Sequence, residues 1–217
     1  MKRIFVTGTG TDVGKTHIAC RWLRRRIAET NPTDRRIGVY KPVASGCTRR
    51  GDDLHAADAE ALWNAAGRPR TLDDVCPQRF IAPLAPYQSA ATEGKQIDEP
   101  KLIRGIDAWQ DHDEVLIEGA GGLLSPITAN LLNIDLAIGL HVDQTILVTD
   151  NRIGVAHAVL STLAAAAARD FRIDQIVLNQ TTAATDDSAQ TNQQLLQDFT
   201  DIPLEIVAFN DQSNSNF

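Results

Sequence analysis

The segment GTGTDVGKT, at positions 8–16, has the residue types and the spacing of a loop that binds phosphate groups. Glycines let the backbone curl so that successive N–H groups point at phosphate oxygens, and a helix that begins here adds its dipole. Lys15 could reach the β- and γ-phosphates of a nucleoside triphosphate, and the Thr16 hydroxyl could bind Mg²⁺. Five residues separate Gly8 from Gly14, one more than in the common form, which indicates a variant found in particular subfamilies.

A second candidate for chemistry is the segment YKPVASG at positions 40–46. Pro42 disfavours helical backbone at Lys41 and keeps the chain extended there. The lysine would then project from the end of a strand, where its ammonium group could stabilise an anionic oxygen. Taken alone, the segment is also compatible with a surface lysine beside a turn.

The third candidate is Glu118, which ends an apolar run and is followed by the sequence GAGG. A carboxylate at the end of a buried strand, opposite a phosphate loop, is typical of a metal ligand, and the glycines permit close approach of backbone to a ligand. Mg²⁺ takes one or two carboxylates together with phosphate oxygens and water. Thr16, Glu118 and one aspartate would meet this need, and Asp52, Asp53 and Asp58 are equally good choices from their positions.

Short apolar strands that alternate with helices must position these groups. We predict strands at 3–7, 37–40, 114–117, 145–148, 175–178 and 204–207, and helices at 15–29, 52–66, 99–109, 130–141, 154–169 and 189–199. Strands without polar alternation favour a mostly parallel central sheet with helices on both faces, and ligands then bind at its C-terminal edge. The sequence therefore predicts an α/β fold of the P-loop NTPase type.

The predicted organisation is a single ATPase-type domain over residues 1–217, with residues 210–217 as a flexible tail. Residues 76–94 contain three prolines and no clear periodicity. This connection either forms a lid over a substrate or simply packs as part of a crossover between strands.

The amino-acid composition limits the kinds of partner and the cellular compartment that we expect for this protein. The net charge of −7 argues against nucleic acid, so we expect none as a partner. The three cysteines lack the spacing of metal ligands, which indicates reduced thiols in a cytoplasm. No signal-peptide pattern is visible, and the most apolar segment, 155–168, is too short to span a bilayer. We expect a cytoplasmic protein without a membrane partner.

The three motifs resemble, in order and spacing, the signature segments of the dethiobiotin synthetase family, over roughly residues 1–180. That family makes the ureido ring of dethiobiotin from 7,8-diaminopelargonic acid, CO₂ and MgATP. The resemblance implies that one amine takes up CO₂ as a carbamate, whose oxygen attacks the γ-phosphate. The second amine then closes on the mixed carbamic–phosphoric anhydride and expels phosphate.

The resemblance also implies roles for individual residues. Lys15 would neutralise the transferring phosphoryl group, Lys41 would hold the carbamate, and the diamine would lie against Thr11, Lys41 and Ser45. Mg²⁺ would be held by Thr16, Glu118 and Asp58, which the family match selects over its neighbours. The nucleotide-binding residues would be Asp12, Val13, Gly14, Lys15, Thr16, His17, Asp58, Glu118, Gly119, Ala120, Gly121 and Asn179. Asn179 would read the adenine edge, although a strand-end asparagine more commonly caps a turn. The family is a homodimer with a composite site, so we expect a homodimer here.

The chain departs from the family pattern in two places. The segment before His157 is one residue shorter than in the family and lacks the family's asparagine. In the family this helix start comes from the partner subunit and receives the substrate's carboxylate tail. A helix N-terminus can still hold an anion there. Residues 204–210 lack the Gly-x-Ile-Pro-like turn that touches the base, which leaves nucleotide selectivity open.

Three alternatives remain beside the synthetase. An amide ligase of cobalamin synthesis uses a similar loop but adds a glutaminase domain, for which 217 residues leave no room. A nucleotide-switched ATPase of the partitioning type usually has another lysine where Thr9 or Gly10 stands here, and often a membrane-binding tail. A degenerate paralogue would bind nucleotide without synthetase activity. A requirement of ATP turnover for diamine and bicarbonate would discriminate between them.

Overall fold

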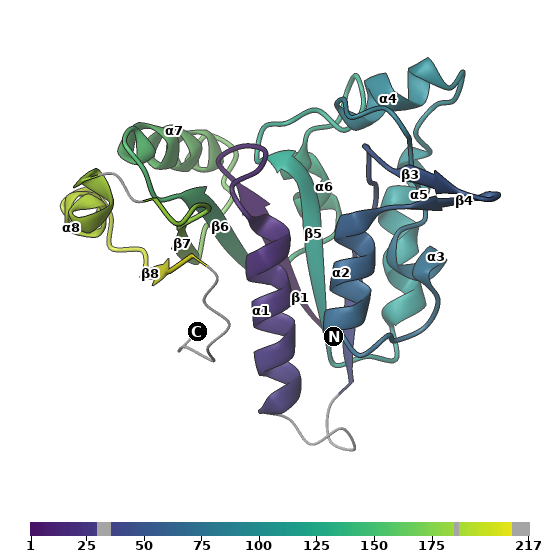
Figure 1. The fold of residues 1–217 in the computed structure, drawn as a ribbon, viewed down its shortest axis with the longest axis horizontal. Coiled ribbons are helices and arrows are strands. Elements are labelled where there is room, and N and C mark those ends of the chain that lie inside the picture. The colour runs from purple at the N-terminus through teal and green to yellow at the C-terminus, as the bar shows by residue number, and fades with distance from the viewer. Residues whose placement is uncertain (30–35, 185–186, 210–217) are drawn as a thin grey trace.

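Six parallel strands form the central sheet of the computed structural model, which describes residues 1–29, 36–184 and 187–209 (Figure 1). Within this part of the chain the strand order is β2-β5-β1-β6-β7-β8, and every neighbouring pair is parallel. The strands are β1 (Lys2–Gly8), β2 (Ile37–Tyr40), β5 (Glu114–Gly122), β6 (Gln144–Asp150), β7 (Gln175–Asn179) and β8 (Leu204–Val207). The predicted parallel α/β fold is confirmed, and the predicted tail at 210–217 lies outside the described residues.

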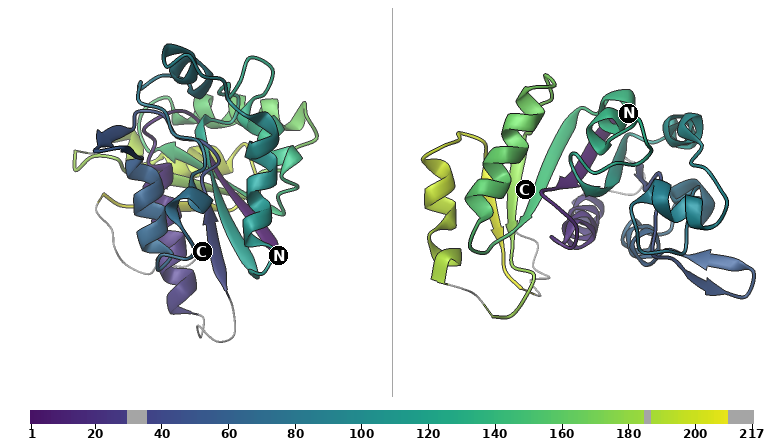
Figure 2. Two further views of the ribbon diagram at one scale, coloured as in Figure 1. Left: turned by 90° about the vertical axis from the view of Figure 1, so that its right-hand side faces the viewer. Right: turned by 90° about the horizontal axis from the view of Figure 1, so that it is seen from above.

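Helices cover both faces of this sheet, as predicted. Helices α1 (Lys15–Ala28) and α2 (Ala57–Ala65) lie on one face, and α6 (Asn133–Gly139) and α7 (Val155–Ala167) lie on the other (Figure 2). Helix α8 (Asn192–Gln197) packs beside α7 near β8. None of the helices in the described ranges is long and apolar enough to cross a membrane.

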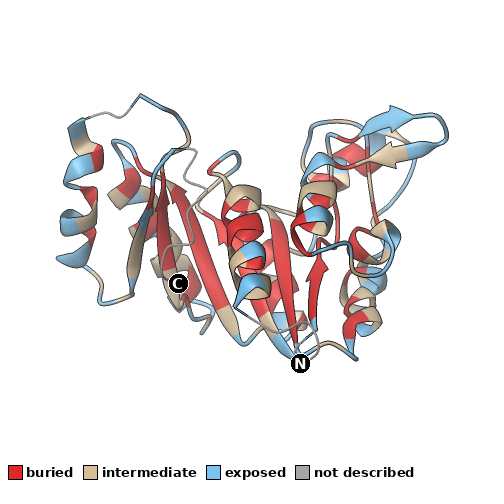
Figure 3. Cartoon of the chain, turned by 60° about the horizontal axis from the view of Figure 1, so that its bottom comes forward, coloured by how far each residue is buried: buried red, intermediate tan, exposed pale blue. Residues whose placement is uncertain are grey.

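The strands form the centre of the hydrophobic core (Figure 3). Ile4, Phe5 and Val6 of β1, like Leu116 and Ile117 of β5, are completely buried. Both faces of these strands are covered, which explains why they read in the sequence as continuous apolar runs. The central strands thereby hold the loops at their carboxyl ends in fixed positions.

The prediction of a helix over 52–66 is wrong at its start. A small antiparallel hairpin, β3 (Thr48–Arg50) and β4 (Asp53–His55), occupies this region, and α2 begins only at Ala57. Gly51 forms the turn with φ of +62°, a conformation that glycine adopts without strain. The hairpin is mostly exposed, so its residues carry no apolar alternation that would distinguish it from a polar helix face.

Three other predicted segments differ in detail. The predicted helix 130–141 shortens to α6, which begins after Leu132, where the N–H of Leu132 donates to the Asp135 carboxylate and caps the helix. The predicted helix 99–109 divides into α5 (Glu99–Arg104) and the 3₁₀ helix η1 (Gly105–Trp109), and 189–199 divides into η2 (Asp187–Gln190) and α8. The connection 76–94 follows α3 (Leu72–Val75) and contains helix α4 (Pro86–Thr92).

Candidate functional site

The glycine-rich loop connects β1 to α1 at the carboxyl edge of the sheet, where the sequence predicted it. Gly14 precedes the first residue of α1 with φ of +88°, a conformation that disfavours a side chain. A Cβ atom at this position would also lie 2.1 Å from Nδ2 of Asn179. That nitrogen donates a hydrogen bond of 3.0 Å to the carbonyl of Val13. The end of β7 therefore supports the loop and requires glycine at position 14.

Lys15 lies folded over the same loop. Its Nζ donates to the carbonyl of Gly10 at 2.9 Å, and the residue is buried. Burial lowers the pKa of Lys15, and the nearby Glu118 carboxylate opposes that shift. The loop thus combines an ammonium group with the N-terminus of a helix, an arrangement that attracts anions.

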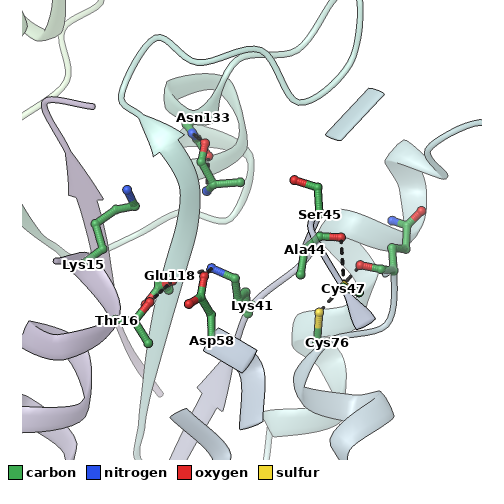
Figure 4. Close-up of polar contacts among 12 residues, drawn as sticks. Lys15, Thr16, Lys41, Ala44, Ser45, Cys47, Asp58, Cys76, Glu118 and Asn133 are labelled. Carbon is green, nitrogen blue, oxygen red and sulfur yellow. Dashed lines mark hydrogen bonds and ion pairs between the residues drawn. The ribbon is translucent and has the colours of Figure 1, made fainter. Parts of the chain in front are cut away.

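A cluster of four side chains, from α1, α2, β5 and the segment after β2, lies next to this loop (Figure 4). Lys41, directly after β2, bonds through Nζ to Oε1 of Glu118 and lies 3.3 Å from Oδ2 of Asp58. The Thr16 hydroxyl donates to the same Oε1 atom at 3.0 Å. The side chains of Lys41 and Glu118 are 4% and 0% exposed, whereas that of Asp58 is 56% exposed. This Lys41 cluster joins residues that are far apart in the sequence.

The charges of the Lys41 cluster stabilise one another. Burial alone would lower the pKa of Lys41, but Glu118 and Asp58 raise it above its ordinary value. Burial would raise the pKa of Asp58, but Lys41 and the Thr16 hydroxyl hold it below its usual range. At neutral pH the ammonium group and the Asp58 carboxylate are therefore both charged.

The same cluster has the donor types that Mg²⁺ prefers. Oε2 of Glu118 is buried and has no hydrogen-bond partner in the described part of the structure. Thr16 and Asp58 add a hydroxyl and a partly exposed carboxylate. No group of three or more His, Cys, Asp or Glu side chains within the described residues could hold a metal by itself. Phosphate oxygens and water would have to complete the coordination.

A cavity of about 720 Å³ opens between the glycine-rich loop, the segment after β2 and the end of β5. One part of its lining is charged or polar, and another part is apolar. The residues that line it are Thr11, Asp12, Gly14, Lys15, Thr16, Lys41, Val43, Ala44, Ser45, Asp58, Pro83, Leu84, Ala85, Pro86, Gly119, Ala120, Gly121, Ser125 and Pro126.

The apolar part of the lining is anchored to the segment after β2. Ser45 donates through its hydroxyl to the carbonyl of Leu84 at 2.7 Å, and the N–H of Gly46 donates to Ala82 at 3.1 Å. The buried hydroxyl of Ser89 bonds to the same Ala82 carbonyl at 2.7 Å. These bonds hold the proline-containing segment in place as a wall of the cavity.

Most of the predicted site residues meet at this cavity. Val13, His17, Glu118 and Asn179 are not part of its lining. Glu118 lies behind the lining in the Lys41 cluster, and Val13 and Asn179 contact each other beneath the loop. His17 is the third residue of α1.

Segment 76–94 was predicted as either a lid over a substrate or the packing of a crossover, and its residues 83–86 line the cavity. Nothing in the sequence indicated two polar residues, Ser125 and Asn133, that bond to the backbone at the end of β5. The prolines within 76–94 were a signal for an irregular segment but not for its position. Ser125 and Asn133 had no signal, because nothing in their spacing links them to the glycines that they contact.

The first comparison places the chain in a class. A family model described as an AAA domain, a P-loop family, matches residues 2–208. A solved ParA family ATPase from Chlorobium tepidum aligns over 97% of this chain and 85% of its own, with a TM-score of 0.50 and 17% identity. This likeness shows the fold alone. The family model and the glycine-rich loop together define an α/β protein of the P-loop class.

Two relatives define the family within that class. The ATP-dependent dethiobiotin synthetase of Rhodopirellula baltica is 45% identical over 211 residues, which cover 92% of this chain and 81% of the relative. The ATP-dependent dethiobiotin synthetase of Caulobacter vibrioides is 39% identical over 189 residues, or 86% of this chain and 83% of the relative. The chain belongs to the ATP-dependent dethiobiotin synthetase family.

Proposed function

We propose that this protein closes the ureido ring of dethiobiotin on 7,8-diaminopelargonic acid with CO₂ and ATP, in biotin biosynthesis. The observation that carries the proposal is the position of the Lys41 ammonium group. It is buried beside Glu118 and lies at a cavity that the glycine-rich loop also lines. A cation fixed there can bind a carbamate within reach of a phosphate group.

The glycine-rich loop would bind the nucleotide. Backbone N–H groups of residues 12–17 would surround the phosphates, and Lys15 would exchange its bond to the Gly10 carbonyl for bonds to phosphate oxygens. The family resemblance assigns Asn179 to the base, and its buried Oδ1 atom has no hydrogen-bond partner in the described part of the chain. That atom could accept a hydrogen bond from the exocyclic amine of adenine.

Thr16, Asp58 and Glu118 would hold Mg²⁺, and the unpartnered Oε2 atom of Glu118 supports this assignment. When bound, the ion would neutralise charge on the phosphate oxygens of ATP. The charge of the ion would add to that of Lys15, so the cavity of an acidic protein would become locally positive.

The diamine would occupy the rest of the cavity, against Thr11, Ser45 and the end of β5. Lys41 would hold the carbamate oxygens through charge-assisted hydrogen bonds. The Ser45 hydroxyl donates a hydrogen bond to the carbonyl of Leu84, so its oxygen can still accept a hydrogen bond from an amine of the substrate. The apolar wall around Leu84 would accommodate the aliphatic chain between the amines and the carboxylate. Alignment and charge neutralisation would supply most of the acceleration.

A homodimer and a cytoplasmic location complete the proposal. The homodimer rests on the family resemblance, and the location rests on the three free cysteines. The net charge of −7 supports the absence of a nucleic-acid partner. Light scattering of the purified protein would test the dimer: a mass of one chain at working concentration would contradict it.

The test of the proposed activity is phosphate release from MgATP and bicarbonate, measured with and without 7,8-diaminopelargonic acid. The proposal predicts release only when the diamine is present. Phosphate release that is the same with and without the diamine would favour a nucleotide-switched ATPase. Nucleotide binding without any turnover would favour a degenerate paralogue.

A further inference from the structure

All polar atoms of the Asn133 side chain bond to the backbone at the end of β5 (Figure 4). Asn133 is the first residue of α6 and is completely buried. Its Oδ1 accepts from the N–H of Ala120 at 3.1 Å. Its Nδ2 donates to the carbonyl of Gly122 at 2.8 Å and to the carbonyl of Ala120. A buried amide with every group paired fixes the backbone to which it bonds.

The backbone that Asn133 holds lies where the pairing of β5 is irregular. Val6 of β1 pairs with Glu118, but the next pair along β1 joins Gly8 to Gly122. Residues 119–121 therefore form a bulge in the ladder between β5 and β1, opposite the single residue Thr7. On the other side, the described pairing of β2 with β5 ends at Ile117. The Asn133 side chain supplies hydrogen bonds that a neighbouring strand would otherwise provide.

The bulged residues connect the Lys41 cluster to the cavity. They follow Glu118 directly, and all three line the cavity. A Cβ atom on Gly119 would lie 2.9 Å from Oδ1 of Asn133 and equally close to Cζ of Phe5. The amide is thus in direct contact with the glycine backbone, and it does not itself line the cavity.

We propose that Asn133 is a positioning residue of the ring-closing reaction. By holding the bulge at 119–121, it sets the position of the cavity wall relative to the Glu118 carboxylate and the Lys41 ammonium group. This wall would line the gap between the nucleotide and the diamine, where the reacting groups meet. The loop that would bind the phosphates of ADP is held separately, by Asn179. This inference rests on the proposed function.

Two substitutions test it. Asn133→Asp retains an acceptor for the Ala120 N–H but places a carboxylate oxygen against two carbonyl groups. Asn133→Leu keeps the branched shape of the side chain and removes all three bonds. In both variants the kcat for diamine-dependent phosphate release should fall about 100-fold, the loss expected when a reacting group is misplaced by about 1 Å. The KM for the diamine should rise, whereas the Kd for MgADP, measured by calorimetry, should stay near that of the unmodified protein.

Gln78→Glu is the matched control. Gln78 also has a buried amide side chain that bonds to backbone. Its Oε1 accepts from the N–H of Asp98 at 2.8 Å, and its Nε2 donates to the carbonyl of Asp98 at 3.0 Å. It does not line the cavity. The same change from amide to acid should lower the melting temperature and leave the kcat nearly unchanged, which separates loss of stability from loss of positioning.

The inference is overturned if Asn133→Leu retains the kcat and diamine KM of the unmodified protein. It is also overturned if the affinity for MgADP falls as far as kcat does, because Asn133 would then support the whole site. The unmodified protein reports on the proposed function separately. If its phosphate release does not depend on diamine, that function and this inference fail together, whatever the variants do.

Discussion

Replacing Lys41 by methionine should destabilise the metal-free protein and make its stability depend on Mg²⁺. The Lys41 ammonium group bonds to Glu118, and the two side chains are 4% and 0% exposed. Methionine is similar in length and apolar, so the variant leaves a carboxylate buried without its closest cation. The cost of that unpaired charge dominates the effect of the substitution.

The expected loss follows from the burial of the pair. Breaking a buried ion pair by removing one partner costs about 3–5 kcal/mol. The contact of Lys41 with Asp58 adds little, because the Asp58 side chain is 56% exposed and solvent screens it. In a domain of this size each kcal/mol shifts the melting temperature by about 2–4 °C, so the midpoint should fall by about 6–20 °C.

Thermal unfolding in EDTA and then in Mg²⁺ with ADP measures this effect. Mg²⁺ should raise the midpoint of the variant more than that of the unmodified protein, because the ion replaces the missing positive charge. Diamine-dependent phosphate release should be lost, whereas MgADP binding should persist. The control is the double variant Lys41→Met/Glu118→Gln, in which neither partner is charged. It should regain most of the lost stability in EDTA, because neutral replacement of both partners of a buried pair is often harmless.

An unchanged midpoint of Lys41→Met in EDTA would refute the reasoning. A double variant less stable than the single variant would refute it as well, because the buried charge would then not be the cause of the loss.

Three further predictions concern the loop, the metal and the thiols. Gly14→Ala should abolish nucleotide binding in calorimetry, because φ is +88° and Asn179 fills the space; retained affinity would contradict this. Glu118→Gln should raise the half-saturating Mg²⁺ concentration of the reaction more than about tenfold; an unchanged value would remove it from the metal site. Burial raises the pKa of Cys20 and Cys76 to about 12 in the folded protein, so the same thiols ionise at lower pH in the unfolded chain. The free energy of unfolding should therefore fall as the pH rises from 9 toward 12. A thiol reagent at pH 8 should therefore label neither cysteine before unfolding, and rapid labelling of the native protein would disprove their burial.

Short sequence patterns predicted the strands and helices whose positions depend on neighbouring residues. The apolar run before Gly8 and the lysine after Gly14 correctly located β1 and the start of α1. The same reasoning failed at the hairpin β3–β4, because its residues are exposed and polar. The pairing of Thr48 with His55 leaves no periodic trace in such a sequence.

The candidate site could be predicted only in part, for a similar reason. Lys41 and Glu118 are 77 positions apart, and they meet because β2 and β5 are neighbours in the sheet. Strand order is a property of the whole fold. The sequence therefore identified Lys41 and Glu118 as candidate site residues but did not show that their side chains meet. Asp58 followed from the family resemblance, since its neighbours looked equally suitable. Asn133 could not be found, because the irregular pairing that it compensates appears only in the folded sheet.

The central claim is that this site joins CO₂ to a diamine at the expense of ATP. Its most direct test supplies ¹³C-bicarbonate, MgATP and 7,8-diaminopelargonic acid, and analyses the products by mass spectrometry together with a phosphate assay. We predict dethiobiotin that carries the ¹³C label, formed in equal amount to the phosphate released. Phosphate without labelled dethiobiotin, or the same phosphate yield when the diamine is omitted, would contradict the claim.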